Sequence, residues 1–310
     1  MVSFEFFTPK TADGERAFFA KTLPVLAAHQ PAYCSVTYGA GGSTRTQTLD
    51  MVQTLQLDWG LAGMAHLTCV GSSRAQVLEL LAESRRRGIR NVLALRGDPP
   101  AGTTGFVRPA GGFQFAYELV ALAREMGGFS IGVAGFPEGH QECRSGKYAD
   151  WQHLKTKIDC GADFVVTQLF FDNAFFYEFR DYLAGRLGVS VPLVPGIIPI
   201  LSAAQVTKFT ALCGATLPAA VQGRLEALRE DDAAVADYGI EWASSQCAEL
   251  LRQGVPGIHF YTLNKARSVA RILENIGLAP THCAATPALQ TTLRPELYAG
   301  ASPDGGGPAQ

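Results

Sequence analysis

The stretch Asn91-Val-Leu-Ala-Leu-Arg-Gly-Asp-Pro-Pro100 shows the pattern on which the fold can be predicted. A short apolar run is followed at once by charged and turn-forming residues. A continuous apolar run of this length, bounded by turn residues, is typical of a strand buried on both faces in a parallel sheet. We therefore predict a buried strand at Asn91–Leu95 with a polar loop at its carboxyl end.

Similar runs occur on both sides of this stretch and bring the number of predicted strands to eight. The others are Val2–Phe7, Tyr33–Thr37, Ala62–Thr68, Ser130–Ala134, Phe164–Gln168, Leu193–Ile197 and Gly257–Tyr261. Longer amphipathic segments separate the strands, which indicates repeated βα units around a parallel sheet. Eight such units favour an α/β fold of the closed (β/α)8 type over an open doubly wound sheet.

The predicted helices fill the gaps between the strands. They lie at Asp13–Ala28, Thr46–Leu57, Ala75–Arg87, Phe115–Met126, Trp151–Cys160, Asn173–Leu187 and Ser202–Leu212, with two more in Leu217–Arg252 and one after Asn264. The block before the last strand is expected to divide near Asp231-Asp232. We expect one barrel domain over residues 1–279 and an extended or disordered tail over 280–310, which is rich in Ala, Pro, Thr and Gly.

Composition excludes several classes of function. The 26 basic and 28 acidic residues leave a net charge of −2, so the chain as a whole is not expected to attract nucleic acid or an anionic membrane. No apolar run reaches the roughly 18 residues of a membrane helix, and the amino terminus does not resemble a signal peptide. Seven scattered cysteines without a CxxC pair favour a reducing cytoplasm, and we expect no metal site.

The predicted strand ends carry most of the candidate site residues, because the carboxyl ends of barrel strands are where chemistry gathers. These residues are Glu5, Thr37, Tyr38, His66, Arg96, Gly97, Asp98, His140, Gln168, Tyr261 and Lys265. Together they form a polar ring on an apolar scaffold, which is typical of a ligand-binding mouth.

Two carboxyl groups are the candidates for chemistry. Glu5 lies between Phe4 and Phe6 in an apolar strand, and desolvation by aromatic rings would raise its pKa and suit it to act as a general acid. The alternative is an edge carboxylate paired with a basic residue. Asp98 could be a fixed negative charge at the mouth, or a turn aspartate paired internally with Arg96.

Other polar residues also have two interpretations. The glycine-rich loop at 39–42 could bind a phosphate, although it matches neither GxGxxG nor a Walker loop; the alternative is an ordinary turn. His66 could bind a cofactor or be a satisfied core residue, Asp150 could cap a helix, and Lys157 could neutralise a diphosphate or be solvated. The amide of Gln168 offers both a donor and an acceptor to the edge of a heterocycle.

Nine segments in order resemble the methylenetetrahydrofolate reductase family. They are Phe4-Glu-Phe-Phe-Thr-Pro-Lys-Thr11, Ser35-Val-Thr-Tyr-Gly-Ala-Gly-Gly-Ser-Thr-Arg45, His66-Leu-Thr-Cys69, Ala94-Leu-Arg-Gly-Asp-Pro99, Phe136-Pro-Glu-Gly-His140, Asp159-Cys-Gly-Ala-Asp163, Thr167-Gln-Leu-Phe-Phe-Asp172, Pro195-Gly-Ile-Ile-Pro199 and His259-Phe-Tyr-Thr-Leu-Asn-Lys265. The resemblance covers roughly residues 2–278 and is closest to the bacterial type, which consists of the catalytic domain only.

The resemblance implies a TIM barrel that binds FAD and transfers hydride in a ping-pong reaction. NADH or NADPH would reduce the flavin, and 5,10-methylenetetrahydrofolate would then take the hydride and become 5-methyltetrahydrofolate, which feeds methionine synthesis. By position, Glu5 would protonate the folate ring nitrogen and Asp98 would favour the cation that forms. Substrate contacts would come from Gln168, Tyr261 and Lys265. Flavin contacts would come from Thr37, Tyr38, Ala40, His66, Arg96, Gly97, Asp98, Ala116, His140, Asp150, His153 and Lys157.

The chain departs from the family pattern in three places. Phe136 stands where Tyr is common, Thr156 replaces a basic residue of some relatives, and Leu201-Ser-Ala203 stands where relatives can carry a Phe. The expected partners are folate and nicotinamide small molecules and a homo-oligomer, without nucleic acid or membrane. The alternative functions are a folate-binding barrel without redox activity and a Schiff-base aldolase, for which only Lys265 comes near the required position.

Overall fold

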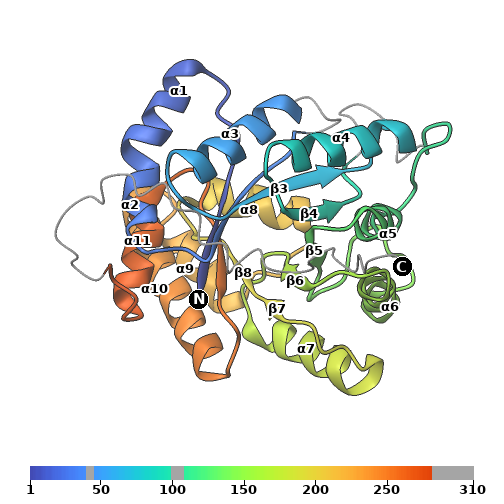
Figure 1. Ribbon diagram of the computed structural model, residues 1–310. Coiled ribbons are helices and arrows are strands. Elements are labelled where there is room, and N and C mark those ends of the chain that lie inside the picture. The colour runs from blue at the N-terminus through green and yellow to red at the C-terminus, as the bar shows by residue number, and fades with distance from the viewer. Residues whose placement is uncertain (40–44, 99–107, 281–310) are drawn as a thin grey trace, which may run out of the picture.

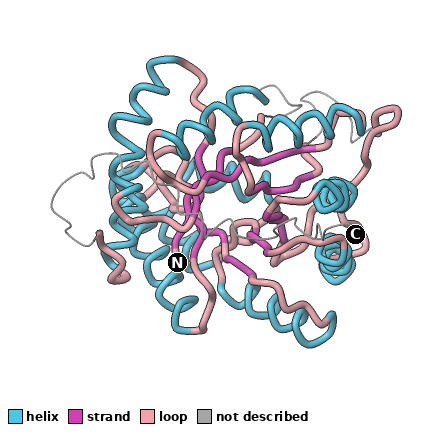
Figure 2. The backbone as a smooth tube through the Cα atoms, viewed as in Figure 1, coloured by secondary structure: helices cyan, strands magenta, loops and turns pink. Residues whose placement is uncertain are grey.

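The computed structural model describes residues 1–39, 45–98 and 108–280, and within these residues nine parallel strands form the centre of the molecule (Figures 1 and 2). The strands are β1 (Val2–Phe6), β2 (Tyr33–Val36), β3 (Gly63–Thr68), β4 (Asn91–Leu95), β5 (Ser130–Gly135), β6 (Phe164–Thr167), β7 (Leu193–Val194), β8 (Gly196–Ile197) and β9 (Ile258–Tyr261). Hydrogen-bonded neighbours follow the order β7-β6-β5-β4-β3-β2-β1-β9-β8.

The predicted strand Leu193–Ile197 is present but divided. Pro195 separates β7 from β8, and proline has no N–H to donate to a sheet. β7 pairs with β6, whereas β8 pairs with β9, so the two short strands together occupy one position between β6 and β9. The nine strands therefore fill eight positions around a barrel, as predicted.

Helices form the outer layer around the strands (Figure 2). They are α1 (Ala12–Ala17), η1 (Phe18–Thr22), α2 (Leu23–Ala27), α3 (Arg45–Leu57), α4 (Arg74–Arg86), α5 (Ala116–Met126), α6 (Lys147–Asp159), α7 (Asn173–Leu187), α8 (Ala203–Cys213), α9 (Ala219–Ala227), α10 (Asp232–Arg252) and α11 (Ala266–Asn275). The predicted break near Asp231 is confirmed, since the Asp231 side chain accepts from two backbone N–H groups that open α10.

The first predicted helix, Asp13–Ala28, differs from the prediction. It contains a π-helical turn, η1, between α1 and α2. Pro24 lies in the first turn of α2 and has no N–H to continue an α-helical ladder, which accounts for a change of hydrogen-bonding pattern at this point.

The barrel has apolar residues on both sides of its strands. Phe4 and Phe6 of β1 are fully buried and pack outward in the cluster that joins the strands to the helices. Met64, Leu93 and Val166 form a second cluster inside the barrel, from strands β3, β4 and β6. Side chains alternate between the two faces of a strand, so Ser3 and Glu5 lie on the opposite face of β1 from the two phenylalanines.

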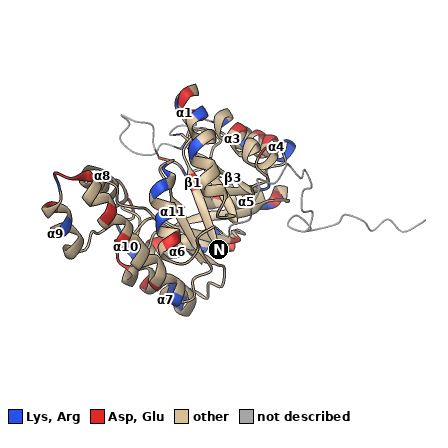
Figure 3. Cartoon of the chain, turned by 90° about the vertical axis from the view of Figure 1, so that its left-hand side faces the viewer, with Lys and Arg blue, Asp and Glu red and all other residues tan. Residues whose placement is uncertain are grey.

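Helices α8, α9 and α10 gather on one side of the barrel and have a small apolar cluster of their own (Figure 3). Gly239 in α10 allows the closest of these contacts, because a Cβ there would lie 2.1 Å from the backbone oxygen of Ile200. Leu169 and Ile198 belong to the same cluster, so α10 supports the segments that follow β6 and β8. These segments lie at the carboxyl ends of the strands.

The surface and the cysteines agree with an ordinary globular chain. Acidic and basic residues are interspersed along the outer helices (Figure 3). The six cysteines in the described part of the chain are all free thiols. Among the described helices, none combines the length and apolar content that a bilayer crossing requires.

Candidate active site

Glu5 lies inside the barrel between two histidines. Its Oε2 atom is 3.3 Å from Nε2 of His66 on β3 and 3.6 Å from Nε2 of His259 on β9. All three side chains are buried. Neither Nε2 atom makes a directed hydrogen bond among the described side chains, but both lie close enough to the carboxylate to favour its ionised form.

The expected rise in the pKa of Glu5 is wrong. Burial of the carboxyl does raise its pKa, but the two imidazoles, His66 foremost, lower it by more, and the pKa falls from 4.5 to about 2. The neighbouring rings of Phe4 and Phe6 do not surround the carboxyl, because alternation along the strand turns them to the other face. Glu5 is therefore a buried carboxylate beside two imidazoles, which is nearer to the alternative interpretation, a carboxylate paired with a basic residue, than to a protonated acid.

Asp98 lies just beyond the carboxyl end of β4 and is exposed. Gly97 has a φ of 85°, and a Cβ there would lie 2.6 Å from Val70 Cγ1 and 2.9 Å from Thr68 Cβ. A glycine is therefore required for the turn that carries Asp98. The predicted alternative of an Arg96–Asp98 pair is replaced by an ion pair between Arg96 and Glu142, with a distance of 2.6 Å.

The two carboxylates belong to the same end of the barrel. Burial, with a smaller contribution from the charge of nearby Asp98, raises the pKa of the Cys213 thiol to about 11. Burial likewise raises the pKa of Tyr261 well above 10, with smaller contributions from Glu5 and Cys213. Because β1, β4 and β9 run parallel, Glu5, Asp98 and Tyr261 lie toward the same, carboxyl end of the barrel.

A second group of expected site residues lies between β5 and α6. Burial raises the pKa of Asp150. Lys157, a backbone hydrogen bond from His140 and the charges of His140 and His153 act in the opposite direction and lower this pKa, but by less. The Lys157 ammonium donates to the backbone oxygen of Ala134 at 2.6 Å, and burial lowers its pKa to about 8. Four residues expected to bind the cofactor are therefore neighbours, and they combine cationic with acidic groups.

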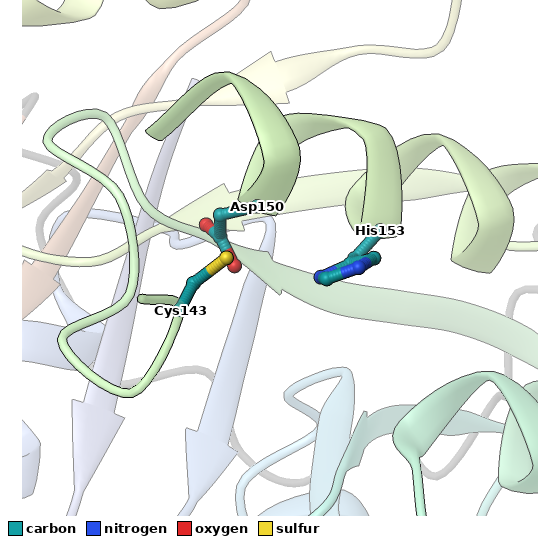
Figure 4. Close-up of side chains that lie close together, drawn as sticks. All are labelled: Cys143, Asp150 and His153. Carbon is teal, nitrogen blue, oxygen red and sulfur yellow. The ribbon is translucent and has the colours of Figure 1, made fainter. Parts of the chain in front are cut away.

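Cys143 joins this second group although the sequence pattern gave it no role. Its sulfur lies beside the Asp150 carboxylate, with the His153 ring on the same side of α6 (Figure 4). One ligand atom of each residue lies within 4.8 Å of the others, so the three could approach a metal ion. Because Asp150 and His153 already belong to the group expected to bind the cofactor, we assign no separate site to these residues.

The remaining expected contacts are distributed around the same end. Tyr38 accepts a hydrogen bond from Arg45 at 2.8 Å, and the backbone oxygen of Thr37 accepts from Thr48 at 2.9 Å. Ala116 is the first residue of α5. Ala40 and most of the glycine-rich loop lie outside the described residues.

The three expected substrate contacts are held in different ways. The Gln168 side-chain oxygen accepts from the backbone N–H of Leu169 at 2.9 Å. The Tyr261 hydroxyl donates to the backbone oxygen of Thr167 at 2.6 Å, so its ring is fixed across the mouth. Lys265 is exposed at the start of α11. Tyr261 and Gln168 are therefore better fixed than Lys265.

Sequence reasoning missed His259 as part of the site. The residue was quoted in a family segment, but nothing in the sequence indicates that it contacts Glu5. The register of β1 with β9 pairs Ser3 with His259 and Glu5 with Tyr261, which requires knowledge of strand neighbours. The alternation of His259 and Tyr261 along one strand was the signal that could have placed both on the inner face.

The inner end of the site also contains polar atoms that can accept a ligand. Among the described side chains, Thr68 Oγ1, Ser35 Oγ and His66 Nε2 are buried without a hydrogen-bond partner. Buried polar atoms normally find partners, and those at a binding site often find them in a ligand. These atoms lie at the carboxyl ends of β2 and β3, between Glu5 and Asp98 in the strand order.

The fold and this polar mouth place the chain among (β/α)8-barrel proteins that bind small molecules at the carboxyl ends of their strands. A family model described as "Methylenetetrahydrofolate reductase" matches residues 1–277. The chain therefore belongs to the methylenetetrahydrofolate reductase family, as the sequence resemblance predicted.

Individual relatives agree with this assignment. A "5,10-methylenetetrahydrofolate reductase" of Pectobacterium carotovorum subsp. carotovorum is 37% identical, over 90% of this chain and 91% of the relative. "Methylenetetrahydrofolate reductase (NADH) 1" of Arabidopsis thaliana is 39% identical, over 89% of this chain and 48% of the relative. The chain thus spans about half the length of the plant relative and nearly the whole of the bacterial one.

A solved structure has the same fold at low sequence identity. It is titled "Uncharacterized protein from Clostridium thermocellum binds two copies of 5-methyl-5,6,7,8-tetrahydrofolic acid". It is 14% identical to this chain with a TM-score of 0.60, and the match covers 90% of this chain and 94% of that protein. At this identity the likeness supports the barrel fold.

Proposed function

We propose that the chain catalyses the FAD-dependent reduction of 5,10-methylenetetrahydrofolate to 5-methyltetrahydrofolate, with NADH or NADPH as the source of hydride. The single observation that carries this proposal is the buried carboxyl of Glu5 at the same barrel mouth as the exposed carboxylate of Asp98, in a chain of this family. The reaction requires one hydride and one proton, so a flavin site and an acid must share one mouth.

The residues present suit a flavin dinucleotide. His140, His153 and Lys157 can offset the charge of a diphosphate, and Asp150 can accept hydrogen bonds from a sugar. The unpartnered polar atoms of Thr68 and His66 can bond to the edge of a heterocycle. A bound flavin would supply the redox chemistry, while the protein positions it and sets its electrostatics.

In this proposal Glu5 gives a proton to the folate ring nitrogen as the five-membered ring opens to an iminium ion. Because the carboxyl is ionised when the mouth is free of ligand, it must gain a proton before it can act. His66 and His259, both within 3.6 Å, are the nearest groups through which this proton can reach the carboxyl. General acids of this kind typically contribute about 10²–10⁴-fold to a rate.

Asp98 supplies a fixed negative charge in the same proposal. The iminium ion that accepts the hydride is a cation, so a carboxylate near it stabilises the developing charge. Gln168 and Tyr261 would orient the pterin and the nicotinamide, and Lys265 would contact the acidic part of the folate. NADH and the folate would use the same face in turn, in a ping-pong order, and the product would serve methionine synthesis.

The test is stopped-flow absorbance of the purified protein. We expect a yellow flavin band that bleaches on mixing with NADH or NADPH and returns on mixing with 5,10-methylenetetrahydrofolate. A colourless protein that nevertheless binds 5-methyltetrahydrofolate would support a folate-binding barrel without redox activity. A flavin that bleaches but is not reoxidised by the folate would contradict the proposed substrate.

A further inference from the structure

The carboxyl of Glu5 has a buried neighbour whose two ends reach the same strand. His259 extends from β9 toward β1, where its Nδ1 lies 2.8 Å from Ser3 Oγ and its Nε2 lies 3.6 Å from Glu5 Oε2. One imidazole ring therefore bridges two residues of β1 that are two positions apart and point into the barrel. Both Ser3 and His259 are almost completely buried.

The ring of His259 is also fixed from its sides. The Tyr33 ring on β2 stacks on it, with ring centres 5.6 Å apart and an angle of 21°. The Tyr261 ring meets it edge-on, with centres 5.4 Å apart and an angle of 88°. These two contacts hold the imidazole against β1, so we expect a change in the protonation of Glu5 to be accompanied by a change of hydrogen bonds around a ring that stays in place.

Serine and histidine have the groups for such a change. A serine hydroxyl can donate or accept, and a neutral imidazole carries one N–H and one bare nitrogen. When Glu5 is ionised, Nε2–H can face the carboxylate while Ser3 donates to Nδ1. When Glu5 is protonated, its O–H can face a bare Nε2 while Nδ1–H donates to Ser3. Both arrangements leave each buried group with a partner.

We propose that Ser3 and His259 form an adaptive pair that partners Glu5 in both its ionised and its protonated form, so that the carboxyl can lose and regain a proton without moving. One proton from solvent separates the two forms: it is added to the Glu5 and His259 pair and leaves from Glu5 to the folate nitrogen. His259 is thus a positioning residue for the acid. The role of this pair in turnover rests on the proposed function. The arrangement of hydrogen bonds among Ser3, His259 and Glu5 does not.

The other groups that face Glu5 are held differently. His66 on β3 lies 3.3 Å from the same oxygen atom, and its Nε2, like that of His259, has no directed hydrogen-bond partner among the described side chains. His259 differs in the contact of its Nδ1 with Ser3. The Tyr261 hydroxyl on β9 is committed to Thr167. Tyr33 on β2 stacks on the ring of His259. Its hydroxyl oxygen lies near Ser3 and can accept a hydrogen bond from the Ser3 hydroxyl when Ser3 itself accepts from Nδ1. Cys213 of α8 contributes to the surroundings of Tyr261.

The first test is the pH dependence of reoxidation of the reduced enzyme by 5,10-methylenetetrahydrofolate, measured in a single turnover. In Ser3→Ala, the Nδ1 atom of His259 loses its hydrogen-bond partner. A ring with its proton on Nδ1 would then leave a buried N–H unpaired, which is rare in proteins. The ring should therefore keep its proton on Nε2, facing an ionised Glu5. The rate should then be lost at a pH about one unit lower than in the unmodified chain. In His259→Phe the carboxyl keeps its burial but loses a donor, so the rate should be lost about one unit higher.

Two matched variants separate this inference from a loss of packing. Ser3→Thr keeps the hydroxyl and should restore the pH profile of the unmodified chain. Ser84→Ala removes a buried hydroxyl from α4, where it donates to the backbone oxygen of Leu80, so it should leave the profile in place. Shifts of Ser3→Ala and His259→Phe in the same direction, or an equal shift in Ser84→Ala, would overturn the proposal.

A second measurement does not depend on the proposed reaction. Nitrogen-15 NMR of labelled histidines in the purified protein reports which ring nitrogen carries the proton. We expect His259 in the ligand-free protein to carry a single ring proton, on Nε2, with the resonance assigned from its loss in His259→Phe. A ring protonated on both nitrogens would overturn the adaptive pair, whereas failure of the folate reaction with the expected tautomer would count only against the proposed function.

Discussion

Glu5 and Asp98 are both carboxylates at strand ends, yet their surroundings give them different properties. Glu5 is buried against two imidazoles, and its pKa is lowered to about 2 because their effect exceeds that of burial. Asp98 is exposed on a turn that Gly97 makes possible. The sequence indicated both residues as candidates, but it predicted the wrong direction for the pKa of Glu5, because the partners across the barrel are far apart in the chain.

Asp98→Asn removes the fixed negative charge while keeping the size of the side chain. We expect reoxidation of the reduced enzyme by 5,10-methylenetetrahydrofolate to slow by about 10²-fold, equivalent to about 2.7 kcal/mol of transition-state stabilisation. Stopped-flow absorbance at saturating folate measures this rate.

The control for Asp98→Asn is Asp159→Asn, which removes an exposed carboxylate from the end of α6. It tests whether loss of any one negative charge alters the reaction, and we expect a rate close to that of the unmodified chain. If Asp98→Asn reoxidises as fast as this control, Asp98 has no part in stabilising the cation.

At the scale of elements, the strands were predictable and the contacts among them were not. Buried parallel strands are continuous apolar runs, so each predicted strand is found within a residue or two of its place. Pro195 was visible within the predicted seventh strand. The division of that strand into β7 and β8 was not, because it depends on β7 pairing with β6 and β8 pairing with β9. The π-helical turn before Pro24 was missed for a similar reason, since apolar spacing does not distinguish helix types.

Gly239 in α10 tests how this element supports the mouth. Alanine favours a helix over glycine by about 1 kcal/mol. At position 239, however, its Cβ would lie 2.1 Å from the backbone oxygen of Ile200, so overpacking should outweigh this gain. We expect Gly239→Ala to lower the free energy of unfolding by about 1–3 kcal/mol, measured by denaturant titration.

Gly223→Ala in α9 is the matched control, because no atom lies within 4 Å of the Cβ it would add. This variant should be as stable as the unmodified chain or slightly more so. Equal stability of the two alanine variants would mean that the packing of α10 against Ile200 does not constrain the fold.

At the scale of the whole molecule, the sequence predicted the eight-position barrel and the end at which its polar residues gather. Strand order in a barrel follows chain order, which brings residues as distant as Glu5 and His259 together when the last strand meets the first. His140, Asp150, His153 and Lys157 were all among the expected flavin contacts, and they lie close together in the chain, from the end of β5 into α6. The buried contacts of His259 required the register of β1 and β9.

The role of Glu5 as the acid is the central claim, and the two half-reactions of Glu5→Gln measured by stopped flow test it most directly. We predict that NADH or NADPH still bleaches the flavin at a rate within a few-fold of the unmodified chain, while reoxidation by 5,10-methylenetetrahydrofolate falls by at least about 10²-fold. Reoxidation at the unmodified rate, or an equal loss in both half-reactions, would contradict the account.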